Sequence, residues 1–136
     1  MTNHRNTQSP RSRLWLLLSE LWLDTEITTI TRQWLAREMA KLPYSSMDIR
    51  EIHEEEVAPV LFHNLYFNPA GEWAGFDEEW LLQECHRCFL KKSSPWARIK
   101  LWLKRNAVRM LTEDILTDVL NQMESIRNSK PQAQQE

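Results

Sequence analysis

Apolar residues near the start of the chain recur at spacings of three and four, which is the period of an α-helix. The apolar positions wrap nearly all the way around this segment. They are Leu14, Trp15, Leu16, Leu17, Leu18, Leu21, Trp22 and Leu23. A helix that is apolar on most sides is usually buried. The pattern therefore predicts a central helix over about residues 11–23.

A second helix is predicted over about residues 28–42, ended by Pro43. The side of this helix expected to face the core carries Ile30, Trp34, Leu35 and Met39. A third helix should start after Ser45, because Asp48 lies at the capping-box spacing from this serine. It should run to about Val57, with Pro59 either kinking it or opening a short helix through His63.

The second half of the chain carries two further helix signals. After a loop over about residues 64–75, Asp77 begins a helix that ends near Lys91. Ser94 and Pro95 form an N-cap and first-turn pair. Apolar residues then continue at helical spacing to about residue 127, as one long helix or as two helices with a break near Thr112.

No segment shows the alternation of a strand, and glycine is scarce, with 2 in 136 residues. Few glycines disfavour tight hairpins and favour helices joined by short polar turns. The predicted fold class is all-α, a compact bundle of five to six helices. We expect a single helical domain over residues 11–128, with disordered tails at 1–10 and 129–136.

The longest apolar run, residues 14–18, is far shorter than the roughly 20 residues that span a bilayer. The polar N-terminus is not followed by a small-residue cleavage site, so a secretory signal is not expected. The two cysteines give no indication of an oxidising compartment. These features predict a cytoplasmic protein.

Two local patterns resemble metal sites without completing one. Cys85 and Cys88 have a zinc-type spacing around His86, but structural zinc takes four ligands and no second such pair exists. Core cysteines on a helix are the favoured interpretation. His53 precedes three glutamates as in a metalloprotease helix, yet the second histidine position is occupied by Val57. We therefore predict no catalytic residue, no metal ligand and no cofactor.

Charge is distributed unevenly, although the net charge is only −2. Residues 48–56 carry five acids, most simply a solvated helix face. Residues 91–109 carry seven lysines and arginines and no acid, with tryptophans interleaved, a pattern that can bind nucleic acid. An acidic chain argues against that role, and the basic helix could instead pair with the acidic segments.

Tryptophan is abundant, and the tryptophans are expected to have different structural roles. Trp15, Trp22 and Trp34 lie on predicted core stripes. Trp73 lies in a loop between two glycines, where it is either a lid on the core or an exposed binding anchor. Most tryptophans are buried for their area, whereas exposed ones often dominate protein interfaces.

Three blocks of the chain resemble a family of short bacterial proteins catalogued as a domain of unknown function. The blocks are LWLLLSELWLDTE (residues 14–26), EEVAPVL (55–61) and AGEWAGFDEEWL (70–81). The resemblance covers about residues 13–82 and implies a bacterial source and a helical fold. It implies no activity, and the basic segment after about Lys92 lies outside it.

Small helical proteins of this kind often act as immunity proteins beside antibacterial toxins, and this analogy gives the leading hypothesis. We expect a non-enzymatic module that binds a cognate toxin or effector protein through acidic side chains around an apolar anchor, with the oligomeric state left open. The expected partner-binding residues are Asp48, Glu51, Glu54, Glu55, Glu56, Glu72, Trp73 and Phe76. The alternative is a nucleic-acid-binding or regulatory protein that uses Lys100, Lys104, Arg105 and Arg109.

Overall fold

The computed structural model describes residues 9–23, 27–61, 78–91 and 95–134, and every element in these ranges is helical. The elements are α2 (Pro10–Leu23), α3 (Thr29–Ala40), α4 (Ser46–Ile52), the π-helical turn η1 (His53–Val57), α6 (Glu78–Lys91) and α7 (Pro95–Gln134). Within the described ranges the prediction of an all-α bundle is confirmed. None of the described helices combines the length and the apolar character needed to cross a bilayer.

Helix α2 lies at the centre of the bundle, as its apolar pattern predicts. It contacts α3, η1, α6 and α7. Its start is set by Ser9, whose hydroxyl accepts a hydrogen bond from the amide of Ser12 at 3.1 Å, and by Pro10, whose missing N–H would have had no helical partner. The buried side chains of α2 form the middle of the core: Leu14, Trp15, Leu17, Leu18, Leu21 and Trp22.

Helix α3 is rotated relative to the prediction. Leu35 and Met39 are buried as expected, together with Ala36, but Ile30 is 76% exposed and Trp34 is 37% exposed. At about 100° per residue, Ile30 and Trp34 fall on the side of the helix opposite the buried three. The buried stripe faces α7, the element with which α3 makes its most extensive contact. The predicted core positions of Ile30 and Trp34 are therefore wrong.

Helix α4 begins with the predicted capping box. The Ser45 hydroxyl accepts a hydrogen bond from the Asp48 amide at 3.1 Å, and the Asp48 carboxylate accepts one from the Ser45 amide at 3.2 Å. The helix then widens into η1, closed by a hydrogen bond from the Ala58 amide to the His53 carbonyl. Residues 58–61 continue as helix. Pro59, which has no amide hydrogen to donate, directly follows this wide turn and lies within the helical continuation.

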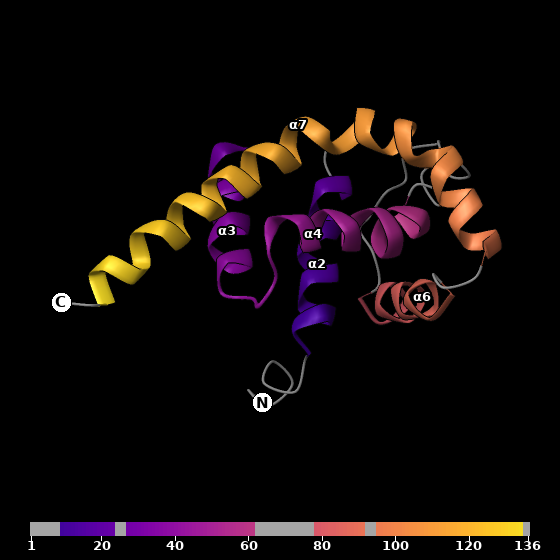
Figure 1. Ribbon diagram of the computed structural model, residues 1–136, viewed down its shortest axis with the longest axis horizontal. Coiled ribbons are helices and arrows are strands. Elements are labelled where there is room, and N and C mark those ends of the chain that lie inside the picture. Colours follow the sequence, from indigo (N-terminus) through magenta and orange to yellow (C-terminus); the bar gives the residue numbers. More distant parts are fainter. Residues whose placement is uncertain (1–8, 24–26, 62–77, 92–94, 135–136) are drawn as a thin grey trace.

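Helix α7 is one continuous helix, so the question of one helix or two is settled in favour of one. It arches over the other helices and ends beyond them (Figure 1). Thr112, considered as a possible break, is buried inside it. The helix continues to Gln134, through the segment from residue 129 for which the sequence predicts a disordered tail.

The second half of α7 fastens the bundle through Arg127. The guanidinium of Arg127 donates hydrogen bonds to carbonyl oxygens at the end of α3 and in the following turn. The acceptors are Met39 (3.0 Å), Ala40 (3.4 Å), Leu42 (2.8 Å) and Tyr44 (2.6 Å). The last carbonyls of a helix have no partner within it, and a cation there is also favoured by the helix dipole. Arg127 therefore caps α3 from a helix more than 80 residues away.

Three more polar contacts extend this attachment along α7. Arg32 of α3 pairs with Asp118 at 2.9 Å. Arg50 of α4 pairs with Glu113 at 2.9 Å and also donates to Thr117. The apolar side chains beneath these pairs are buried: Leu116, Val119, Leu120 and Met123. Helices α3 and α4 are thus held against one helix by both apolar packing and directed bonds.

Replacing Arg127 with Ala should lower the free energy of unfolding by about 2 kcal/mol, because hydrogen bonds from a charged donor are lost and carbonyls are left unpaired. Urea unfolding followed by circular dichroism measures this change. The matched control is Asn128→Ala, an exposed neighbour, which should change stability by less than about 0.5 kcal/mol. Equal effects of the two substitutions would show that Arg127 does not cap α3.

Candidate functional site

A fully buried carboxylate joins α2 to η1. The side chain of Glu56 is 0% exposed. Arg11 binds it with two hydrogen bonds, from Nε to Oε1 and from Nη2 to Oε2, each 2.8 Å long. The indole N–H of Trp15 donates a third bond to Oε1, also at 2.8 Å. Arg11 and Trp15, which donate these three bonds, both belong to α2. The Glu56 carboxylate therefore fixes the N-terminal half of α2 against the π turn.

The expected position of Glu56 on a solvated acidic face is therefore wrong. Glu56 faces inward together with His53 and Val57, on the side of the helix that also carries the buried Ile49 and Ile52. Glu54 and Glu55, in the same turn, are half-buried. Only Asp48 and Glu51 of the predicted acidic run are exposed, and Asp48 also caps α4. Acidic composition did not distinguish the buried glutamate from its neighbours, whereas helical spacing from the buried Ile49 and Ile52 does.

The second buried polar group, His53, is bound by another tryptophan of α2. Trp22 donates its indole N–H to Nε2 of His53 at 3.1 Å. A ring nitrogen that accepts this bond carries no proton, so the imidazole is neutral. Burial lowers the pKa of His53 to about 4, while Glu113 opposes and Arg50 adds to the shift. The hydrogen bond between Trp22 and Nε2 of His53 therefore joins α2 to η1.

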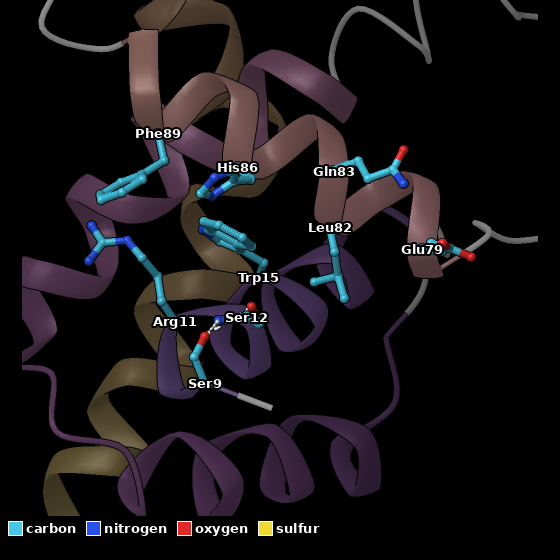
Figure 2. A pocket seen from close by; sticks show the side chains of 9 residues that line it. All are labelled: Ser9, Arg11, Ser12, Trp15, Glu79, Leu82, Gln83, His86 and Phe89. Atoms are coloured by element: carbon cyan, nitrogen blue, oxygen red, sulfur yellow. Dashed lines mark hydrogen bonds between the residues drawn. The ribbon is translucent and has the colours of Figure 1, made fainter. Parts of the chain in front are cut away.

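A pocket opens between α2 and α6, beside the buried ion pair (Figure 2). Its volume is about 480 Å³, within the range of sites that hold small ligands. The indole of Trp15 forms the back wall, and His86 approaches it in an edge-on arrangement at 6.4 Å between centroids. The lining residues are Ser9, Arg11, Ser12, Trp15, Glu79, Leu82, Gln83, His86 and Phe89.

The walls of this pocket are held in place by the groups behind them. Arg11 lies between Glu56 and Phe89, with its guanidinium carbon 4.4 Å from the centre of the phenyl ring. The ring of Phe89 in turn lies 6.1 Å from that of His86. Hydrogen bonding to Glu56 raises the pKa of Arg11, against the opposing effect of burial. The guanidinium therefore stays charged and oriented, and the pocket is preformed.

The cysteines behave as the sequence predicts. Cys85 is fully buried in the core and Cys88 is partly buried, and both are free. Burial raises the pKa of both thiols, which disfavours the thiolate that binds metals or attacks electrophiles. His86, considered with them as a metal ligand, lines the pocket instead. Among the described residues no three His, Cys, Asp or Glu side chains are grouped to hold a metal ion.

A second surface feature is the side of α3 that faces away from α7, here called the α3 outer face. Glu38 pairs with Arg13 at 3.0 Å and with Lys41 at 2.8 Å, so the two cations are held on a shared carboxylate. The guanidinium of Arg13 also lies 5.9 Å from the ring centre of Trp34. The face consists of Ile30, Gln33, Trp34 and Arg37 of α3, its C-cap residue Lys41, and Arg13 of α2.

The remaining predicted site residues are not brought into either feature. Glu72, Trp73 and Phe76 lie outside the described residues. The backbone of α7 carries Lys100, Lys104, Arg105 and Arg109 in its first half, but their side chains also fall outside the described part. Sequence reasoning did not predict the pocket: it assigned no role to Arg11 or Phe89, and it considered His86 only as a metal ligand. Arg11 precedes the apolar stripe and shows no periodic signal, so only its position opposite Glu56 reveals its role.

The chain belongs to the family described as a domain of unknown function (DUF7079), whose model matches residues 9–122. The predicted membership in a domain-of-unknown-function family is thereby confirmed. The match extends well beyond the expected residues 13–82 and includes the basic segment of α7, which was wrongly placed outside the family. It also includes Arg11, Trp15 and Glu56. No curated protein and no solved structure matched the chain.

Acidification should weaken the fold through His53. Below about pH 6.5 the unfolded chain binds a proton at this histidine, whereas the folded protein does so only near pH 4. Stability from the neutral imidazole is therefore complete above about pH 6.5 and is lost as the pH falls toward 4. Between pH 7 and pH 5 the wild type should lose about 2 kcal/mol more than His53→Gln, in which an amide oxygen accepts the Trp22 bond.

Urea unfolding of both proteins at pH 7, 6 and 5 measures this difference. Glu38 and Asp118 also favour the folded state when ionised, because hydrogen bonds to cations lower the pKa of each carboxyl. Their contribution is present above their unfolded pKa values and is lost mainly below pH 5, and it is common to both proteins. Parallel pH profiles for the wild type and the variant would contradict the assignment of a neutral, buried His53.

Proposed function

We propose that this protein is a non-enzymatic protein-binding module, most concretely a cytoplasmic immunity protein that neutralises a cognate antibacterial toxin by direct binding. The observation that carries the proposal is the α3 outer face, where Trp34 and Ile30 are exposed among fixed cations. The bundle does not use this side of α3 for its own packing, since the helix packs through Leu35, Ala36 and Met39 on its other side.

The composition of the α3 outer face is that of an interaction hot spot. Tryptophan and arginine contribute most of the binding energy in many protein interfaces, particularly near the centre of the contact. Trp34 lies between Ile30 and Arg37 along the helix, and Arg13 covers part of its ring. A partner that desolvates Trp34 and Ile30 would bury apolar surface that the free protein leaves in water.

The attachment of α3 favours binding without rearrangement. Arg127 fixes the end of the helix, and Arg32 pairs with Asp118 along its flank. A surface that is already ordered loses little conformational entropy when a partner docks. This rigidity supports a direct-binding role, in which the inhibitor presents a finished surface to its target.

The charges of the α3 outer face indicate the chemistry of the partner. Arg13 and Lys41 both pair with Glu38 at the edge of this face, and Arg37 is exposed beside them, so cations outnumber acids among the described residues here. A complementary surface would therefore carry carboxylates around an apolar centre, and such complementarity speeds association and disfavours wrong partners. The exposed acids Asp48 and Glu51 of α4 remain a second candidate surface, suited to a basic partner.

Binding is favoured over catalysis by the state of the reactive side chains. Glu56, His53 and Cys85 are the buried groups with the strongest potential for acid–base or nucleophilic chemistry. The carboxylate is held by Arg11 and Trp15, the imidazole accepts a bond from Trp22, and burial keeps the thiol protonated.

The choice of a toxin as the partner rests on analogy with small helical immunity proteins.

The test is a tagged pull-down in which neighbouring gene products are co-expressed, read by mass spectrometry, followed by a growth assay. We expect one stoichiometric protein partner that is toxic when expressed alone and harmless when this protein is co-expressed. Trp34→Ala combined with Arg37→Glu should reduce affinity at least tenfold and abolish protection, because both substitutions remove hot-spot contacts at an exposed face.

Two matched variants show which surface acts. Glu51→Lys reverses an exposed charge on α4, and Lys100→Glu with Lys104→Glu reverses two charges on α7. Both should leave protection intact. Loss of protection with Glu51→Lys alone would transfer the role to α4. Recovery of nucleic acid instead of protein, with binding that weakens steeply with salt and is lost in the α7 variant, would replace the proposal with the nucleic-acid alternative.

A further inference from the structure

We propose that the pocket between α2 and α6 binds a small planar aromatic molecule with one hydrogen-bonding substituent, of the phenol or indole type. This inference is independent of the α3 outer face, because neither Trp34 nor Ile30 lines the pocket. It concerns a second site of the same domain, one that no feature of the family description assigns.

The shape and chemistry of the walls favour a flat ring. Trp15, His86 and Phe89 present three aromatic surfaces around the pocket, and Leu82 closes one side (Figure 2). Edge-on and tilted ring pairs are already present, at 6.4 Å for Trp15 with His86 and 6.1 Å for His86 with Phe89. A further ring can join this arrangement in the offset or edge-on geometry that aromatic pairs prefer.

The pocket also offers polar atoms at its edge for a single substituent. The Ser12 hydroxyl accepts a hydrogen bond from Ser9 at 3.0 Å, which leaves the Ser12 proton for another acceptor. Gln83 lines the same pocket from α6 and is exposed, so its amide can donate or accept. A phenolic hydroxyl or an indole N–H matches these polar groups, and a highly charged ligand is disfavoured because the charged lining residues, Arg11 and Glu79, have opposite signs.

The site keeps its form without a ligand because the rigid core holds it. The back wall, Trp15, is only 3% exposed and is bound to Glu56 by its indole N–H. The same carboxylate orients Arg11, which lies against Phe89. Trp15 and Phe89 are therefore positioned by the buried ion pair before a ligand arrives, which limits the entropy lost on binding.

The experiment compares phenol with cyclohexanol, which has the same number of heavy atoms and the same hydroxyl group on a puckered ring. Each is titrated into the isotope-labelled full chain and followed by two-dimensional NMR. We expect saturable binding on the order of millimolar, with the largest shifts at Trp15, His86 and Ser12. Phenol should bind about two- to tenfold more tightly than cyclohexanol, because aromatic pairing adds to simple burial.

Two blocking variants and one control locate the binding. Leu82→Trp fills the pocket and should weaken phenol binding at least tenfold. Gln83→Trp, at an exposed position, provides the same test should the first variant fail to fold. Trp34→Ala should leave phenol binding unchanged. Equal affinity for phenol and cyclohexanol, shifts that fall outside the pocket, or unchanged binding in a folded blocking variant would each overturn the proposal.

Discussion

The buried carboxylate of Glu56 is the constraint on which the rest of this structure depends. A carboxylate removed from water is stable only when hydrogen-bonded cations or donors replace the lost solvation. Here Arg11 and Trp15 supply those bonds from a single helix. The need to hydrogen-bond the Glu56 carboxylate thus determines how the start of α2 packs against η1. It also fixes the position of Trp15, which lines the pocket between α2 and α6.

The two exposed features of the molecule are each supported by a separate set of polar contacts. The pocket rests on Arg11 and Glu56, while the α3 outer face rests on Arg127 and its bonds to the end of α3. Both sets join segments distant in sequence, so each surface is ordered only when the whole bundle forms. One helical bundle therefore carries two surface features, the pocket and the α3 outer face, that are supported by different polar contacts.

Sequence reasoning was most successful where the signal was local. The central helix, the capping box at Ser45 and the core position of Cys85 follow from short-range periodicity and side-chain chemistry. It failed where partners are distant. The outward position of Trp34 depends on which side of α3 meets α7. Glu56 follows the helical spacing of the buried Ile49 and Ile52, but the cation that stabilises a carboxylate there, Arg11, lies 45 residues away in the sequence. Neither α7 nor Arg11 can be recognised as a partner from spacing.

The most direct test of the central role of Glu56 is a double-mutant cycle with Arg11→Met, Glu56→Met and the combined variant, measured by urea unfolding. If the pair organises α2 and η1, Glu56→Met should destabilise the fold by about 3 kcal/mol, because Arg11 loses its carboxylate partner and the buried indole N–H of Trp15 loses its acceptor. The double variant should be more stable than the sum of the single changes predicts by about 2 kcal/mol. Additive effects, within about 0.5 kcal/mol, would contradict the account and show that the two side chains contribute independently.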